Sequence, residues 1–325
     1  MTQVLAIDIG GTNTKIAIVE SSGKVGEVTS TPTNGVLGVD NYLHNVVQEA
    51  KKAISKEHQI IDGVGIGVAG FVDSAHTKMT YNPNIAWLEN VSLEDYISSR
   101  LDLPVFIEID SNAATLAEAV HGNGRDSKRL LVLTIGTGLG GGMTINRVIL
   151  RISNECLGDI GHVIVEPGGP QCAAGCKGCA EAMVSSSALE RYYLELLQTN
   201  QQVNQKNSNN DKIMSAYEII KSAHSGNRVS IKAIQKLGKY LGTALASITP
   251  IFAPDKICVA GGISEAGAIL LESTRSNFFD IAGPPYAKGV TIEKAMLGWQ
   301  SVLVGAALAY QRSKITTTRI NENTD

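Results

Sequence analysis

Residues 4–19 read VLAIDIGGTNTKIAIV, two aliphatic runs joined by a glycine-rich turn. The two runs, residues 4–7 and 16–19, predict a pair of strands that form a hairpin. An ordinary hairpin turn does not need two glycines, two threonines, an aspartate and a lysine together. Free backbone N–H groups and hydroxyls suit phosphate oxygens, and a carboxylate suits Mg²⁺. The turn therefore predicts a phosphate site, with these candidates: Asp8, Gly10, Gly11, Thr12, Asn13 and Lys15.

Residues 129–145, RLLVLTIGTGLGGGMTI, repeat this pattern. An aliphatic run over 129–135 predicts a strand, a glycine- and threonine-rich turn follows, and residues 143–145 predict a second strand. The repeat favours an internally duplicated α/β architecture in which two phosphate-binding turns face each other. Thr137 and Gly138 are the candidate phosphate contacts of the second turn.

The second turn also matches G-x-G-x-x-G, at Gly136, Gly138 and Gly141. In a dinucleotide-binding Rossmann unit a helix follows these glycines directly. The sequence that follows here, MTINRVIL, is rich in β-branched residues and favours a strand. We therefore disfavour the Rossmann interpretation.

Composition limits the class of protein. The 325 residues suffice for two domains, and a net charge of −3 without any basic run argues against a nucleic-acid-binding surface. No apolar stretch is long enough to span a bilayer, and Asp8 interrupts the early apolar segment, so we expect neither a membrane span nor a signal peptide. Five cysteines, three of them clustered, fit a metal site in a reducing cytoplasm better than a disulfide framework.

Asp110 follows a predicted strand over residues 105–109 and precedes a predicted helix over 113–120. A carboxylate at the C-terminal end of a strand is where α/β sheets place ligand-binding groups. Asp also favours the N-cap of a helix, but Ser111 or Asn112 can take that role. Asp110 is therefore the candidate catalytic residue.

The remaining pattern alternates helices and strands. Residues 257–260 predict a strand, and Gly261 and Gly262 after it would bring backbone close to a flat ligand such as an adenine ring, although close packing of helix on strand explains them equally well. We expect a mobile polar loop over 199–212 and a frayed tail over 312–325. Helices are predicted over residues 36–54, 93–101, 187–197, 213–223, 229–248 and 299–310, and a buried strand over 60–68.

The segment 158–181, GDIGHVIVEPGGPQCAAGCKGCAE, concentrates metal-binding chemistry. Thiolate and imidazole are the ligands that Zn²⁺ prefers, and a closed structural site takes four of them. His162, Cys172, Cys176 and Cys179 would supply four. We therefore predict a structural zinc site that holds this segment in shape.

These motifs together resemble the ROK family of sugar kinases and sugar-responsive repressors. The resemblance runs from Asp8 to Gly305 and is carried by D-I-G-G-T-N-T-K, I-D-S-N-A-A, G-T-G-L-G-G-G and G-H…C…G-x-x-G-C-x-E. It implies a two-domain, actin-like (RNase H-like) fold that closes over a sugar and ATP, and a homodimer. We place the N-terminal domain at residues 1–117 with a returning helix at about 300–325, and the larger domain with its zinc-binding loop at 118–299.

The resemblance also implies roles for single residues. Asp110 matches the catalytic base, which also touches the sugar, and Gly261-Gly262 matches the turn that contacts adenosine. His162, Cys172 and Cys179 match zinc ligands. The positions that match sugar contacts are Asn84, Asp159, His162 and Glu181.

Three positions depart from the family pattern. Ile109 stands where an Asn usually precedes the catalytic Asp, which removes one hydrogen bond to sugar. Asp159 replaces a Glu and is one methylene shorter. The middle zinc cysteine usually lies at the position of Ala174, whereas the third thiol here is Cys176. Either the site closes through Cys176 after a local change of the loop, or it is weakened or lost.

The favoured function is an ATP- and Mg²⁺-dependent kinase that converts a hexose to its 6-phosphate, with Asp110 as general base. The substrate stays open among glucose, N-acetylmannosamine, fructose and β-glucosides. A sugar-responsive repressor is an alternative, but we expect no helix-turn-helix domain because the first strand begins at about Val4. A catalytically silent sugar-binding protein is the other alternative, and Ile109 and Asp159 are the reasons to consider it.

Overall fold

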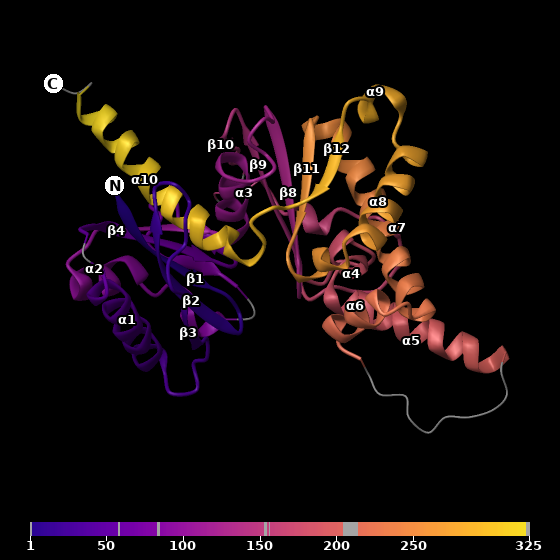
Figure 1. Cartoon of the computed structure of the whole chain (residues 1–325), viewed down its shortest axis with the longest axis horizontal. Helices are drawn as coiled ribbons and strands as arrows, with labels where there is room; N and C mark the ends of the chain where they lie inside the picture. Colours follow the sequence, from indigo (N-terminus) through magenta and orange to yellow (C-terminus); the bar gives the residue numbers. More distant parts are fainter. Residues whose placement is uncertain are drawn as a thin grey trace. The chain divides into compact units, whose positions relative to one another are not determined.

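The computed structural model divides into two compact units (Figure 1). The first contains residues 1–126, 142–158 and 297–325, and the second contains residues 127–141 and 159–296. The predicted domain division at residue 117 stays a prediction. The structure describes residues 2–57, 59–82, 85–152, 155, 157–203 and 214–322.

The first unit is built on a five-stranded sheet of order β3-β2-β1-β4-β7. The hairpin strands β1 and β2 are antiparallel, as β2 and β3 are, whereas β4 runs parallel to both β1 and β7. The hairpin expected from residues 4–19 is therefore present. The strands are β1 (Gln3–Ile9), β2 (Asn13–Glu20), β3 (Thr29–Pro32), β4 (Ile61–Val68) and β7 (Val105–Ile109).

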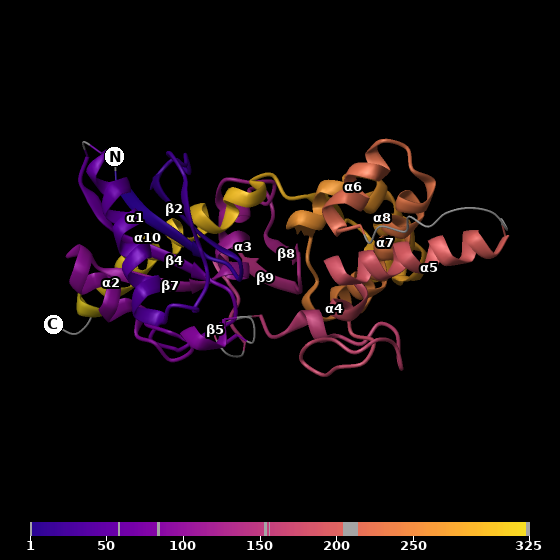
Figure 2. The same cartoon turned by 90° about the horizontal axis from the view of Figure 1, so that it is seen from below.

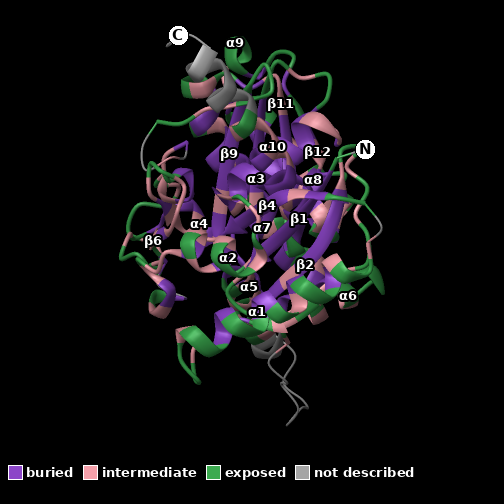
Figure 3. Cartoon of the chain, turned by 90° about the vertical axis from the view of Figure 1, so that its left-hand side faces the viewer, coloured by how far each residue is buried: buried purple, intermediate pink, exposed green. Residues whose placement is uncertain are grey.

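Both faces of this sheet are buried. Alternate side chains of a strand point to opposite faces, so each strand contributes to two cores. Leu5 and Ile7 of β1 belong to a core that includes residues of α1 (Val39–Ser55) and α2 (Leu93–Leu101). Val4 and Ala6 belong to a second core with residues of α3 (Asp110–Val120) and α10 (Ser301–Glu322). Figure 3 shows β1 and β4 buried along nearly their whole length, while α2 carries exposed residues.

Helix α10 approaches the rest of the first unit very closely. A Cβ on Gly305 would lie 1.7 Å from the Ala113 carbonyl oxygen of α3, and one on Gly65 of β4 would lie 2.1 Å from the Ala306 carbonyl oxygen. Only glycine allows both contacts, since any Cβ there would overlap backbone atoms. The last helix therefore fixes the position of α3, the helix that begins with Asp110. A two-stranded sheet of β5 (Phe71–Val72) and β6 (Met79–Tyr81) and the short helix η1 (Ala86–Leu88) complete the unit.

A second five-stranded sheet has the order β10-β9-β8-β11-β12. In both sheets the third, second, first, fourth and fifth strands lie side by side in that order, and the fourth pairs in parallel with the first and the fifth. The same topology occurs twice, which confirms the predicted internal duplication. The strands are β8 (Arg129–Ile135), β9 (Leu139–Ile145), β10 (Val148–Ile149), β11 (Lys256–Ala260) and β12 (Thr291–Lys294).

The second unit adds a layer of helices. Figure 2 shows α7 with α5 and α8 beside it. Gly238 and Gly242 of α7 allow the contact with α8, because a Cβ at either position would lie 3 Å or less from α8 backbone oxygens. The helices are α4 (Ala180–Met183), α5 (Ser186–Val203), α6 (Ala216–His224), α7 (Arg228–Phe252), α8 (Ala268–Ile281) and α9 (Pro284–Ala287), with short turns η2 (Ile160–His162) and η3 (Gly262–Ala266). The short turn η4 (Gly298–Gln300) belongs to the first unit and precedes α10.

Several sequence expectations are tested by these elements. The strand over 129–135 has the predicted bounds, and a strand rather than a helix follows the glycines, so the Rossmann interpretation is excluded. Two polar segments were expected to lack regular structure, and this was wrong for part of each. Helix α5 continues to Val203 and α10 to Glu322, because neither stretch contains a glycine or proline to end the helix. Residues 204–212 of the expected loop lie outside the described residues.

Candidate active site

Asp8 and Asp110 both belong to the first unit, at the C-terminal ends of β1 and β7. These strands flank β4 and run parallel to it, so their ends share one edge of the sheet, where α/β sheets bind ligands. Lys15 lies with its Nζ atom 3.4 Å from Asp8 Oδ2. Burial raises the pKa of Asp8 above its usual value, and the Lys15 ammonium opposes that rise.

Asp110 is the first residue of α3 and keeps some solvent access. The surrounding protein and the negative charge of Asp8 raise the pKa of Asp110 to about 7, although the carboxylate accepts a hydrogen bond of 2.6 Å from the Ser111 N–H. A carboxyl group that titrates near neutrality is suited to accept and release a proton. The geometry therefore allows Asp110 to act as a general base.

The expected capping role of Ser111 or Asn112 is wrong. Both lie inside α3, which begins three residues before the predicted start. The Asn112 amide donates instead to Glu108 Oε1 and to the Glu155 carbonyl, and the Ser111 carbonyl accepts from the Thr115 hydroxyl. The Asp110 carboxylate accepts from the N–H of its neighbour Ser111, and the N-cap residue Ile109 makes no side-chain capping bond, so the helix start does not depend on a conventional cap.

The first glycine turn is exposed over Gly11, Thr12 and Asn13. It is closed by a hydrogen bond from the Gly10 N–H to the Asn13 carbonyl, 3.2 Å long. Thr14 anchors it from the protein side, with its hydroxyl 2.8 Å from that of Thr33 and 2.6 Å from that of Tyr42. The turn thus presents backbone and hydroxyl groups to solvent from a fixed base, as a phosphate loop requires.

The second glycine turn and Glu181 are brought together in the second unit. The Gly136 N–H donates to the Gly138 carbonyl at 2.9 Å, and Thr137 between them is exposed. Glu181 Oε2 accepts from the Leu139 N–H at 3.1 Å, and a Cβ on Gly138 would lie 2.5 Å from that same oxygen. Gly138 therefore leaves the space that the Glu181 carboxylate occupies.

The presence of glycine has different explanations at positions 261 and 262. Gly261 has φ +84° and a Cβ there would lie 2.3 Å from the Ile135 carbonyl oxygen, so close packing onto β8 requires glycine. Nothing lies within 4 Å of the corresponding position on Gly262. The packing alternative thus explains Gly261, and open space that a ligand can use remains at Gly262.

His162 lies between Asp159 and the cysteine cluster. Its Nε2 is 3.3 Å from Asp159 Oδ2, and its Nδ1 is 3.6 Å from Cys172 Sγ. The ligand atoms of His162, Cys172 and Cys179 lie within 4.8 Å of one another. Cys179 is fully buried, and burial raises the pKa of its thiol to about 11.

The donor set of this cluster fits Zn²⁺, since two thiols and an imidazole are ligands of the type that zinc prefers. Cys176 does not belong to the group of three in the described chain. It lies on the same small hairpin, where the Cys172 N–H donates to the Cys176 carbonyl at 2.9 Å. Partial desolvation and the Cys172 thiol raise the pKa of the Cys176 thiol. A fourth donor is thus close in the chain, and its role stays a prediction.

Asn84, the remaining sugar-contact candidate, lies outside the described residues. The sequence reasoning missed a network behind Asp110. Glu108 is 1 % exposed, and its carboxylate receives the Arg151 guanidinium, with 2.5 Å between Oε2 and Nη2. A charged residue within the otherwise apolar strand VFIEI was the signal that pointed to it.

Comparison with known proteins adds the evolutionary relationship. The model of the ROK family matches residues 4–313. The chain belongs to the ROK family. It is 30% identical to a glucokinase of Halalkalibacterium halodurans, over 98% of both chains, and 29% identical to one of Thermotoga maritima, over 94% of this chain and 96% of the relative. It is also 32% identical to the xylose repressor of Bacillus subtilis, but over only 66% of this chain and 52% of the repressor.

Solved structures agree with this assignment. A ROK glucokinase from Streptomyces griseus, in complex with glucose and AMPPNP, superposes with a TM-score of 0.82 at 29% identity and covers 95% of this chain and 99% of its own. A ROK transcriptional regulator homologous to the E. coli MLC protein has a TM-score of 0.84 at 26% identity, with 95% and 78% covered. The predicted two-domain α/β fold of ROK sugar kinases is thereby confirmed. In the described chain, no helix combines the length and the apolar character needed to cross a membrane.

Proposed function

We propose that this protein transfers the γ-phosphoryl group of ATP to a hydroxyl of a hexose, glucose being the first candidate. The observation that carries the proposal is Asp110, a carboxyl with a pKa of about 7 at the ligand-binding edge of the first sheet. Similarity to glucokinases over 96% or more of their length supports the same proposal. The xylose repressors, in contrast, are matched over 52% to 69% of their length.

In the proposed reaction Asp110 accepts the proton of the sugar hydroxyl as that oxygen attacks the γ-phosphorus. The bond from the γ-phosphorus to the bridging oxygen breaks, and ADP leaves with that oxygen. The turns at Gly10–Asn13 and Gly136–Gly138 are proposed to hold phosphate oxygens through N–H groups and hydroxyls. Mg²⁺ bound with ATP would neutralise phosphate charge, and Asp8 is the residue suited to hold it.

Recognition of the sugar is proposed to fall to Asn84, Asp159, His162 and Glu181, together with Asp110. A carboxylate accepts hydrogen bonds from hydroxyls, and the Glu181 side chain is already held by the Leu139 N–H. The exposed Asp159, one methylene shorter than the usual Glu, leaves room for a differently substituted sugar or a bridging water. Gly262, with open space around it, is the better candidate of the glycine pair for contact with adenosine.

The test of the function is ADP release measured across a panel of glucose, N-acetylmannosamine, fructose and β-glucosides. We expect turnover with at least one sugar, and a loss of about 10²–10⁴-fold in kcat for Asp110→Asn. Asp102→Asn is the matched control, because Asp102 is exposed and its left-handed backbone suits Asn as well as Asp. Saturable sugar binding without any turnover would reject the kinase in favour of a silent sugar-binding protein.

We further propose that His162, Cys172, Cys179 and Cys176 bind one Zn²⁺, which would brace the loop that carries Asp159. Elemental analysis is expected to find about one zinc per chain, as one four-ligand site requires. Cys172→Ser is expected to lose the metal, whereas Cys258→Ala, a buried cysteine of β11, is expected to keep it. Zinc-free wild-type protein with normal sugar affinity would refute this role. The zinc content of Cys176→Ser shows whether Cys176 is the fourth ligand.

Two further expectations come from the family resemblance. We propose a homodimer, which sedimentation equilibrium would test, and action in the cytoplasm, where ATP is supplied. A monomer at micromolar concentration would contradict the first.

A further inference from the structure

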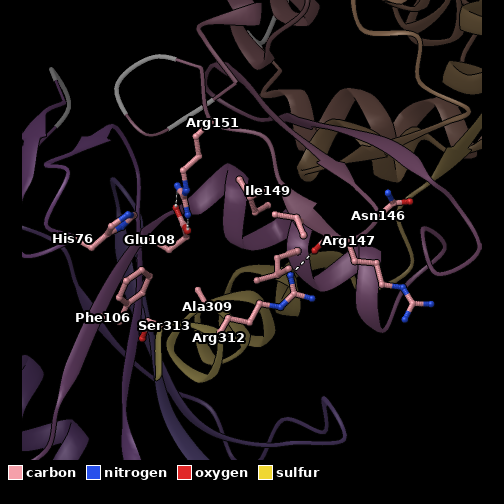
Figure 4. A pocket seen from close by; sticks show the side chains of 12 residues that line it. His76, Phe106, Glu108, Asn146, Arg147, Ile149, Arg151, Ala309, Arg312 and Ser313 are labelled. Carbon is pink, nitrogen blue, oxygen red and sulfur yellow. Dashed lines mark hydrogen bonds and ion pairs between the residues drawn. The ribbon is translucent and has the colours of Figure 1, made fainter. Parts of the chain in front are cut away.

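A pocket of about 610 Å³ lies within the first unit, and strands β7 and β10 and helices α3 and α10 contribute to its walls (Figure 4). This volume is in the range of small-molecule sites. None of the described residues that line it is a candidate for the sugar, nucleotide or metal sites above. Its chemistry therefore needs a separate explanation.

Positive charge predominates in this pocket. Three arginines line it, Arg147, Arg151 and Arg312, against Glu108 in the lining and the adjacent Glu155, whose Oε2 lies 3.6 Å from His76 Nε2 and 3.7 Å from Arg151 Nε. Glu108 is already engaged with Arg151. Burial and the neighbouring Arg147 lower the pKa of Arg312 below its usual value, so the Arg312 guanidinium stands in a positive field. An anion bound there would lower the electrostatic energy of the pocket.

The backbone fixes Arg312 in this place. Asn146 and Arg147 form the two-residue turn between β9 and β10, and both have positive φ, 51° and 66°. Such values are expected in a two-residue turn of this kind, although they are unfavourable for an arginine. The turn directs the Arg147 carbonyl at the Arg312 guanidinium, which donates a hydrogen bond to it (Figure 4). The turn between β9 and β10 therefore fixes the Arg312 guanidinium at the wall of the pocket.

Apolar side chains form another part of the lining, beside the polar His76, Asn146 and Ser313. Phe106 of β7, Ile149 of β10 and Ala309 of α10 contribute to it. The His76 ring stacks on Phe106 with 4.5 Å between ring centroids, which orients the Phe106 ring. A site that combines one fixed guanidinium with apolar walls recognises a ligand with a charged head and an apolar body.

We propose that this pocket binds a small organic anion, whose phosphate or carboxylate pairs with Arg312 and whose apolar body lies against Phe106 and Ile149. The planar guanidinium presents a fork of N–H donors that matches both head groups. Head-only and body-only molecules satisfy one half of the pocket each and should bind much more weakly.

The test is calorimetric titration of the full chain with phenyl phosphate and, separately, benzoate, which distinguish the two head groups. Glucose and AMPPNP are present at saturation, so that the proposed substrate sites are filled. Inorganic phosphate and benzyl alcohol are the head-only and body-only controls. Because binding rather than turnover is measured, a failure of the kinase proposal would leave this result interpretable.

Two variants locate the binding site. Arg312→Gln removes the cation and Ile149→Glu adds a carboxylate to the apolar wall, and each is expected to weaken binding at least about tenfold. Arg100→Gln, an exposed arginine of α2 outside the pocket, is the matched control and should bind as wild type does. Circular dichroism checks that each variant is folded. If Arg312→Gln is misfolded, the test rests on Ile149→Glu. No saturable binding of either anion at about 10 mM, or binding unchanged in the folded variants, would overturn the proposal.

Discussion

Opposing electrostatic effects act on Asp110. The positive end of the α3 dipole and the hydrogen bond from the Ser111 N–H both favour the ionised carboxylate, which lowers the pKa. Burial and the negative charge of Asp8 favour the protonated form, and they prevail, because the pKa rises to about 7. A base with this pKa is ionised for part of the molecules at neutral pH and still binds a proton well, which is the compromise that general-base catalysis requires.

The pH dependence of kcat/KM tests this balance. We expect kcat/KM to rise with pH through about 7, because only the ionised carboxylate can accept the hydroxyl proton. Asp8→Asn removes the neighbouring negative charge and should shift the inflection to lower pH, even though it also lowers the rate. Asp102→Asn should leave the inflection in place. A profile that is flat across neutral pH would show that the titration of Asp110 does not control the reaction.

Residues with local chemistry could be predicted from the sequence. Asp8, Asp110 and the two glycine turns stand in short motifs, so their places at strand ends and between strands could be predicted, and their roles in binding and catalysis are proposals. Arg151 could not be predicted as the partner of Glu108, because the two are 43 residues apart and only the folded chain brings them together. The expected cap at Ser111 or Asn112 failed because both residues lie inside α3, where the Asn112 amide donates to Glu108 and to the Glu155 carbonyl.

At the level of elements, β7 and α3 carry Asp110 and are tied together by Glu108. The Glu108 carboxylate accepts from the Ile109 N–H, from Asn112 and from Arg151, so it joins the end of the strand to the first turn of the helix. Arg151 also donates to the Glu155 carbonyl at 2.7 Å. This ion pair therefore stabilises the junction from which Asp110 projects.

Breaking the ion pair should destabilise the protein. Arg151→Gln leaves Glu108 buried without its cation, which costs about 3–5 kcal/mol for a fully buried pair and less here, because the Arg151 side chain is 30% exposed. The double variant Glu108→Gln/Arg151→Gln should recover much of that loss. Denaturant unfolding measures both, with Arg100→Gln as the control for loss of an exposed arginine. Glu108→Gln alone completes the cycle, and a loss in the double variant equal to the sum of the two single losses would mean that the pair is not coupled.

The bounds of some strands and helices were predicted and those of others were not, since α2 has the expected bounds and β9 begins at Leu139 instead of residue 143. Strand β8 has the expected bounds because its aliphatic run ends at a glycine, whereas α5 and α10 extend beyond their apolar residues. The periodicity of apolar residues shows where a helix packs, but it does not show how far a helix continues once no glycine or proline stops it. Three of the four expected metal donors converge, since their spacing places them on one small hairpin and the turn before it.

At the level of the whole molecule, the two sheets share one strand order, which the duplicated strand–turn–strand motif in the sequence anticipated. A returning C-terminal helix was among the expectations from the sequence, whereas the contribution of residues 142–158 to the first unit was not, because the chain leaves this unit at residue 127 and re-enters it at residue 142. All four proposed zinc ligands belong to the second unit, and Asp110 belongs to the first. Changes at the two places should therefore act on different parts of the fold.

Calorimetric unfolding tests this independence. We expect two transitions, because each unit is compact by itself. The Asp110 pKa is raised from 3.8 in the unfolded chain to about 7 in the fold, so its contribution to stability is present below about pH 4 and is lost as the pH rises to about 7. Relative to the wild type, Asp110→Asn should accordingly stabilise the first unit more at pH 8 than at pH 5, by at most about 2.7 kcal/mol for the two pH units between 5 and 7.

Removal of zinc by a chelator at constant pH should lower the other transition, since metal binding stabilises only the folded unit that holds it. Asp102→Asn should move neither transition, and Cys258→Ala should keep the response to the chelator. A single transition that both Asp110→Asn and the chelator move would mean that the units unfold together. Two transitions that both respond to the chelator would mean instead that the metal stabilises more than the second unit, and the proposed zinc ligands would then not account for its effect.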